Sequence, residues 1–169
     1  MEISDGKVSW TKYTRDNILC GHFSLREWHL IVSDIDSDRD WSELLKNNLL
    51  INCYILKQSS TNEPIAFLYT KHESLNGKVI SLHGGGWKKS FTHTILFYRG
   101  FILMVERLLQ DKIKVRTSCT KHNIVAYRFI KSIGFVNYKY SGNYCYFWIN
   151  NQRLRSSKIY NYISKNRRL

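Results

Sequence analysis

The stretch that decides the fold runs from Val79 to Phe135: VISLHGGGWKKSFTHTILFYRGFILMVERLLQDKIKVRTSCTKHNIVAYRFIKSIGF. Its periodicity predicts a strand at 79–83, a glycine bend, a long helix over 92–110, a strand at 114–119 and a helix from Asn123 to Gly134. Each strand leads into the start of a helix, where exposed N–H groups and the positive end of the helix dipole favour an anion. The first of these helix starts is rich in Lys, Ser and Thr. The sequence therefore predicts a phosphorylated ligand held by backbone amides.

Outside this stretch, alternating apolar residues predict further strands, and two segments predict helices, the first with a capping box at Ser24 and Glu27. The expected strands are 7–14, 52–59, 63–73, 135–141 and 143–149, and the expected helices are 24–34 and 40–50. This order predicts an α+β (mixed α/β) fold. We expect one domain over residues 1–152, with a mostly antiparallel central sheet of six to seven strands and four flanking helices. Residues 153–169 form a basic tail, which either frays or makes a short helix.

Charge is distributed unevenly along the 169 residues. Residues 1–73 carry 8 Lys and Arg against 11 Asp and Glu, whereas residues 74–169 carry 18 against two acids, Glu106 and Asp111. Such a basic half attracts anions, and a nucleic acid, a membrane surface or a polyphosphate cofactor are each possible anionic partners. The four alternating acids from Asp34 to Asp40 would attract a cationic amine if they are not simply a solvated loop.

Several function classes lack support in the sequence. The four cysteines match no metal-ligand spacing, no paired histidine motif is present, and no Walker or dinucleotide glycine motif occurs. No apolar run reaches the roughly 18 residues of a membrane helix, and the first ten residues contain no apolar signal region. We therefore expect a cytoplasmic protein with no metal and no membrane partner.

Two motifs resemble those of GNAT-type N-acetyltransferases, and the likeness spans roughly residues 8–149. The family's pyrophosphate loop reads Arg or Gln, two residues, Gly, one residue, then Gly or Ala. Residues 89–94, KSFTHT, fall in this register with Thr at both small positions. The family also has Asn, two residues, Ala, then seven residues to Gly-Phe, and here Asn123, Ala126, Gly134 and Phe135 keep that spacing.

The resemblance implies acetyl-coenzyme A as co-substrate, in a splayed gap between the fourth and fifth predicted strands, 79–83 and 114–119. It places the pantetheine on strand backbone, the pyrophosphate on the helix start with a lysine nearby, and Asn123 against the cofactor. The residues so assigned are Leu82, His83, Gly84, Lys88, Lys89, Ser90, Phe91, Thr92, His93, Thr94, Asn123 and Tyr127.

The acid that protonates the departing thiolate is not found at the family's position. The family often places a tyrosine eight residues into the Asn-containing stretch, where this chain has Ile130. Tyr138, on the final hairpin, is our candidate, with Tyr140 and Tyr144 as alternatives.

A base must also remove a proton from the acceptor ammonium, whose pKa is near 10 for a lysine-like amine. His83, at the end of the fourth predicted strand, is the best-placed candidate, and the alternative is a structural turn histidine held by backbone. Glu73 and His72, at the end of the preceding strand, could act through water.

These residues lead to two competing predictions for function. The first is transfer of an acetyl group to a primary amine, on a small molecule or a protein, by a monomer or homodimer. The second is a basic nucleic-acid-binding module, because Tyr and Trp alternate with basic residues on the final hairpin. A GNAT-like chain that binds coenzyme A without reacting is a third possibility.

Overall fold

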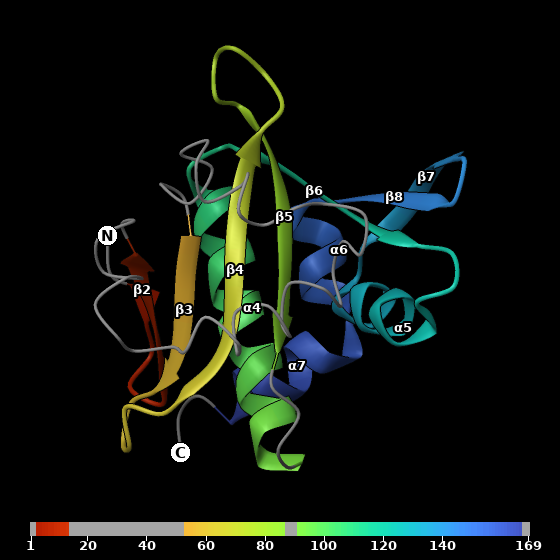
Figure 1. Ribbon diagram of the computed structural model, residues 1–169. Coiled ribbons are helices and arrows are strands. Elements are labelled where there is room, and N and C mark those ends of the chain that lie inside the picture. The colour runs from red at the N-terminus through yellow and green to blue at the C-terminus, as the bar shows by residue number, and fades with distance from the viewer. Residues whose placement is uncertain (1–2, 14–52, 87–90, 167–169) are drawn as a thin grey trace, which may run out of the picture. The chain divides into compact units, whose positions relative to one another are not determined.

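The computed structural model describes residues 3–13, 53–86 and 91–166, with the side chains of 13, 53, 86 and 91–93 left aside. The predicted helices at 24–34 and 40–50 and the acidic stretch between them lie outside these residues. The described elements form a mixed α+β fold with strand order β1-β2-β3-β4-β5-β6-β8-β7 (Figure 1). This confirms the predicted class, with eight strands in place of six to seven.

The strands are β1 (Ile3–Ser4), β2 (Val8–Tyr13), β3 (Cys53–Gln58), β4 (Pro64–His72), β5 (Val79–Gly86), β6 (Lys114–Thr120), β7 (Val136–Ser141) and β8 (Tyr144–Ile149). The helices of the described residues are α4 (Phe91–Gln110), α5 (Ile124–Ile133), α6 (Asn151–Ser156) and α7 (Lys158–Lys165). β5 and β6 pair in parallel, whereas β1–β2, β2–β3, β3–β4, β6–β8 and β7–β8 pair antiparallel.

The chain divides into two compact units, and the first comprises residues 1–71 and 83–100. Its centre is Trp10 of β2, which is fully buried and donates from Nε1 to the carbonyl oxygen of Gly100 at 2.6 Å. A Cβ on Gly100 would overlap the side chain of Leu56 on β3. Glycine at this position therefore lets α4 lie close against β2 and β3.

The second unit comprises residues 72–82 and 101–169. In it, β8 alternates between half-buried and buried residues, with Cys145, Phe147 and Ile149 on the buried side. Phe101 of α4 contacts the rings of Phe129 and Phe135 edge-on. This alternation is the period of a sheet with one face in the core.

Two expectations about local structure need correction or completion. The predicted glycine bend is wrong, because β5 continues as a strand through Gly84 and Gly86. The predicted basic tail forms α6 and α7, and these helices bury Leu154 and Ile163 in the second unit. Each of the two helices begins with a side-chain cap, from Asn150 and Ser157 respectively.

No helix in the described ranges is long and apolar enough to span a bilayer.

Candidate active site

A strand–helix–strand crossover, β5–α4–β6, carries most of the predicted site residues. Its parallel ladder pairs Val79–Leu82 with Lys114–Thr117, and both strands continue beyond this ladder. At its end the buried Thr117 hydroxyl donates to the Leu82 carbonyl oxygen at 2.8 Å. Ligands of such crossovers bind beyond the carboxyl ends of the parallel strands. The predicted residues Leu82, His83 and Gly84 stand at that end of β5.

His83 and Gly84 are part of the first unit. The His83 ring stacks on Tyr69 of β4, with 5.0 Å between ring centroids and 17° between planes. A Cβ on Gly84 would overlap the carbonyl oxygen of Phe67, so the approach of β5 to β4 requires glycine here. The structure thus gives Gly84 a packing role and sets His83 beside an aromatic ring on the neighbouring strand.

The start of α4 lies within the predicted anion loop. The helix begins at Phe91, and its first turn contains no acidic residue. Thr94 is half-buried in that turn. Lys88, Lys89 and Ser90 lie outside the described residues, as do the side chains of Phe91, Thr92 and His93. The helix start is where the sequence predicts it, and the roles of these side chains stay predictions.

The Asn-to-Gly spacing marks the two ends of α5. Asn123 is its N-cap, and its Oδ1 accepts a hydrogen bond from the Ala126 N–H at 2.9 Å. Gly134 ends the helix in the left-handed conformation, with φ of 108°. Tyr127, one turn after Asn123, is half-buried, and its ring meets Phe147 edge-on at 5.5 Å. Asn123 and Tyr127, the two residues of α5 and its cap that the resemblance assigns to the cofactor, therefore also have structural contacts.

Two of the predicted catalytic residues are joined by an arginine that sequence reasoning missed. Glu73 accepts a hydrogen bond from the Ser81 hydroxyl on one oxygen and pairs with Arg116 at 2.9 Å through the other. The Arg116 guanidinium carbon lies 5.4 Å from the ring centroid of Tyr138. Ser81 is a buried polar residue between two apolar neighbours in β5, and this departure from the apolar pattern could have identified it. Arg116 stands at a regular half-buried position of the alternating strand β6 and gives no such signal.

The three hairpin tyrosines differ in their surroundings. Tyr138 is 44% exposed and faces Arg116, whereas Tyr140 is 59% exposed and lies under the Lys121 ammonium at 5.8 Å. Tyr144 is half-buried, with its ring 6.4 Å from that of Tyr146. Tyr138 thus contacts the cluster around Glu73 through Arg116.

Cys119 is not suited to act as a nucleophile at neutral pH. Cys119 of β6 lies opposite Cys145 of β8. Burial, and to a lesser degree the neighbouring Cys145, raise the pKa of the Cys119 thiol to about 11. Because the thiolate is the reactive form, Cys119 is inert near pH 7. Among the described residues no group of three metal-binding side chains occurs.

Solved structures of acetyltransferases superpose on most of this chain. The GNAT-family acetyltransferase from Bacillus anthracis does so with a TM-score of 0.66 and 14% identity, over 90% of this chain and 99% of that one. The fold is that of the GNAT acetyltransferases. A GCN5-related N-acetyltransferase from Brucella melitensis gives a TM-score of 0.68 at 7% identity, over 98% and 84% of the two chains.

The aminoglycoside acetyltransferase AAC(6')-Ib, in complex with coenzyme A and kanamycin, gives a TM-score of 0.66 at 16% identity, over 88% of this chain and 97% of that one. No family model and no curated protein matches the sequence itself. The predicted resemblance to the GNAT fold is therefore confirmed by structure, at identities that establish the fold alone.

Proposed function

We propose that this protein transfers an acetyl group from acetyl-coenzyme A to a primary amine by direct attack of the amine on the thioester. The observation that carries the proposal is the GNAT fold with a parallel crossover, β5–α4–β6, whose first helix starts in a Lys-Ser-Thr segment. Structural neighbours that contain coenzyme A or acetyl-coenzyme A support this choice of co-substrate.

The proposal assigns the pantetheine arm to the backbone of β5 after Leu82, and the pyrophosphate to the start of α4 with Lys88 or Lys89 nearby. The Thr117 hydroxyl donates to the Leu82 carbonyl at the end of the parallel ladder, and the proposal places the pantetheine amides on the backbone that follows, at His83 and Gly84. N–H groups at a helix start, together with the helix dipole, favour a diphosphate. Asn123 and Tyr127 complete the proposed cofactor contacts from α5.

His83 is the base in this proposal. Both oxygens of Glu73 are engaged, one by Ser81 and one by Arg116, so Glu73 is less available to accept a proton from an amine. An imidazole titrates in the range needed to deprotonate an ammonium at neutral pH through an ordered path. Tyr138 is the proposed acid, since its ring lies against Arg116 at the centre of the polar cluster.

Most of the rate enhancement would come from holding amine and thioester together, because positioning alone supplies up to about 7–11 kcal/mol of barrier reduction. N–H groups of β5 would stabilise the oxyanion that develops on the thioester carbonyl. The thiolate of coenzyme A, with a thiol pKa near 8.5, leaves readily, so an acid adds to the rate without being indispensable.

A small amine is the acceptor that we propose. Neighbouring structures of AAC(6')-Ib that contain kanamycin, paromomycin or ribostamycin support acceptors of this type in this fold. A protein lysine is the alternative, and the acceptor library below includes both classes.

The proposal is tested in two stages with the full-length protein. Calorimetric titration with acetyl-coenzyme A should give saturable binding, and single-turnover assays with a library of polyamines, aminoglycosides, amino acids and lysine peptides should release free coenzyme A. Absence of both heat and thermal shift at millimolar acetyl-coenzyme A would contradict the proposal. Binding without turnover on any amine would instead identify a chain that binds the cofactor and does not react.

A further inference from the structure

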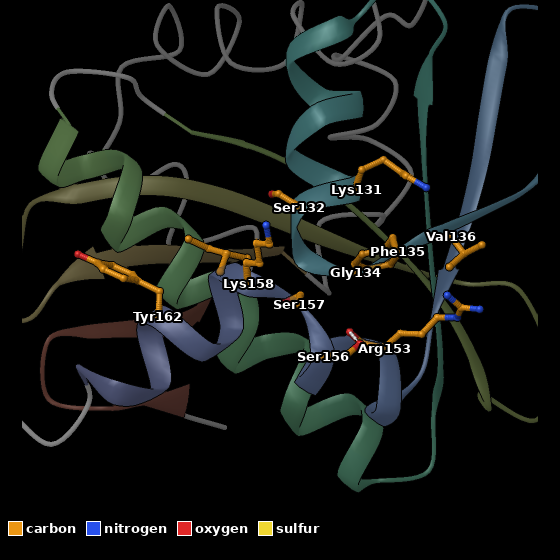
Figure 2. Close-up of a pocket in the computed structure, with 11 residues that line it drawn as sticks. Lys131, Ser132, Gly134, Phe135, Val136, Arg153, Ser156, Ser157, Lys158 and Tyr162 are labelled. Atoms are coloured by element: carbon orange, nitrogen blue, oxygen red, sulfur yellow. Dashed lines mark hydrogen bonds between the residues drawn. The ribbon is translucent and has the colours of Figure 1, made fainter.

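A groove of about 690 Å³ opens between the C-terminal end of α5 and the two C-terminal helices (Figure 2). Gly134 and Phe135 are among the residues that line it, and a Cβ on Gly134 would lie 2.5 Å from the carbonyl oxygen of Arg153. The chain turn at Gly134 therefore lets α6 approach closely and shapes the groove. We call it the C-terminal groove; its volume is in the range of ligand sites, about 300–1,000 Å³.

The C-terminal groove is cationic. Lys131, Arg153 and Lys158 line it together with serine hydroxyls, and no acidic residue does. The second unit contains only three Asp or Glu residues, and each has another partner. Glu73 pairs with Arg116, Glu106 accepts a hydrogen bond from Tyr160, and Asp111 pairs with Arg107. No carboxylate side chain among the described residues of this unit is thus left to neutralise the groove.

The position of Lys158 is unfavourable for a purely structural lysine. Lys158 is the first residue of α7, where the positive end of the helix dipole repels a cation, and the first turn of α7 contains no acid. The Ser157 cap satisfies the N–H of Tyr160 at 3.2 Å. Lys131, in contrast, lies in the last turn of α5, where a cation is stabilised by the dipole. Helix electrostatics thus stabilise Lys131 and disfavour Lys158, and a bound anion would offset the unfavourable position of Lys158.

Aromatic rings accompany these cations. Tyr162 lines the groove one turn after Lys158 and is 53% exposed, so the two side chains share one face of α7. The Arg153 guanidinium carbon lies 5.8 Å from the ring centroid of Trp148. An exposed ring beside a cation, as at Tyr162 and Lys158, is typical of surfaces that bind single strands, where bases stack and phosphates pair with basic side chains.

The cations are spread along the groove and do not converge on one point. Figure 2 shows Lys131 and Arg153 toward one end and Lys158 and Tyr162 toward the other. A single phosphate would be best held by donors that meet at one spot, whereas a chain of phosphates matches charges that are spaced apart. Exposed basic residues continue on the same three helices, namely Arg128, Arg155 and Lys165.

We propose that the C-terminal groove binds single-stranded nucleic acid, with successive phosphates on Lys131, Arg153 and Lys158 and one base stacked on Tyr162. This site is separate from the cofactor contact proposed for Asn123. The groove adjoins the C-terminal end of α5, whereas Asn123 caps the opposite end, ten residues away. Ten helical residues span about 15 Å.

The test uses the full chain and a labelled oligothymidylate of about 12 nucleotides, with binding followed by fluorescence anisotropy over a range of salt concentrations. Wild-type protein should bind, and the affinity should fall with salt. The combined variant Lys131→Glu, Arg153→Glu and Lys158→Glu should bind more than about tenfold more weakly. Its dependence of log affinity on log salt should be shallower by about 2, since each lost single-strand phosphate contact removes about 0.7.

The matched control carries the same charge change at Lys7, Lys12 and Lys71, which are exposed and do not line the groove. The control should keep most of the affinity and the salt dependence. Its net charge changes as much as that of the groove variant, but the groove that holds the nucleic acid is intact. The proposal would be overturned if both variants lost affinity equally, or if the groove variant bound as tightly as the wild type. Failure of the wild-type protein to bind the oligonucleotide would also overturn it. A triple Gln variant, which removes the charges without reversing them, repeats the test with less perturbation of folding.

Further arms identify the ligand. Replacing Tyr162 with Ser should weaken oligonucleotide binding about 5- to 100-fold, and Phe should restore it, because stacking needs the ring and not the hydroxyl. If pyrophosphate or thymidine monophosphate competes as well as unlabelled oligonucleotide, the groove is a small-anion site and the proposal of a single-stranded ligand is overturned. If acetyl-coenzyme A competes with the oligonucleotide, the two ligands share a site and the proposal of a separate nucleic-acid site in the C-terminal groove is overturned.

Discussion

Asn123 accepts a hydrogen bond from the backbone N–H of Ala126 at 2.9 Å, and so closes the first turn of α5. The same asparagine is the residue that the GNAT resemblance assigns to the cofactor. Its Oδ1 is occupied by the cap, so a cofactor contact falls to the Nδ2 amide hydrogens. The two roles use different atoms and can be separated by substitution.

Asn123→Asp should keep the cap and lose the donor. We expect little change in thermal stability, because Asp and Asn are equally good N-caps, and a clear loss of affinity for acetyl-coenzyme A in calorimetry. Asn123→Ala should lose both, with a destabilisation of about 1 kcal/mol. Unchanged cofactor affinity in the Asp variant would leave Asn123 with the capping role alone.

Gly134 should tolerate no side chain. Its φ is 108°, and an added Cβ would lie 2.5 Å from the Arg153 carbonyl oxygen. Gly134→Ala should therefore destabilise the protein by clearly more than the roughly 1–2 kcal/mol that a left-handed conformation alone costs. Gly142→Ala is the matched control, since Gly142 also has positive φ but nothing within 4 Å of an added Cβ. Equal shifts in urea midpoint for the two variants would refute the close contact as the cause.

Both helix ends at Asn123 and Gly134 could be predicted because caps are local: side-chain type and spacing determine them within a few residues. The strands were also predictable from alternation. The glycine segment after His83 was predicted wrongly, because glycines in a strand can serve close packing as well as bending. Because Gly84 has no side chain, β5 can approach the backbone of Phe67 closely. This long-range contact has no local sign in the sequence.

The polar cluster of the second unit was predicted in part. Glu73 and Tyr138 were selected for their chemistry, but Arg116, which contacts both, was not. The two residues are 65 positions apart in sequence, and only the pairing of β6 with β5 and β8 brings Arg116 between them. The C-terminal groove likewise depends on packing of α6 and α7, which the sequence showed only as a basic tail.

The ion pair between Asp5 and Arg99 should contribute strongly to stability. The two side chains are 10% and 5% exposed; Arg99 Nε pairs with Asp5, and Nη2 has no hydrogen-bond partner among the described residues. Asp5→Ala would leave a buried guanidinium without its counter-charge, so we expect a destabilisation of about 3–5 kcal/mol by urea unfolding.

The control for Asp5 is Asp111→Ala. Asp111 pairs with Arg107 at 3.2 Å in an exposed i,i+4 pair, with side chains 43% and 48% exposed. Such a pair contributes about 0.3–0.5 kcal/mol. Similar losses in both variants would contradict the assigned importance of burial.

Tyr138 should affect turnover and not cofactor binding. Tyr138→Phe removes the hydroxyl while keeping the ring beside Arg116, so a general acid at this position should lower kcat by about 10²–10⁴-fold with unchanged affinity for acetyl-coenzyme A. Tyr140→Phe, on the same strand, should leave kcat unchanged. The reverse result would move the acid to Tyr140, and no effect of either substitution would exclude both tyrosines and leave Tyr144 as the remaining candidate.

Cys119 provides a pH-dependent test of the sheet itself. Its pKa of about 11, raised from 9.0 by burial and by Cys145, means that the folded protein holds the thiol proton more tightly than the unfolded chain. Between pH 9 and pH 11 the unfolded chain has lost this proton while the folded protein keeps it, so stability linked to this thiol falls as pH rises through that window. Below pH 9 both states are protonated and the contribution is constant.

Alkylation of the Cys119 peptide by iodoacetamide, followed by mass spectrometry, should be very slow at pH 7.5 and rise about tenfold per pH unit toward pH 11, since only the thiolate reacts. The same peptide in urea should reach its plateau about two pH units lower, near the ordinary pKa, and a native profile that coincides with the urea profile would show that the thiol is not buried between β6 and β8.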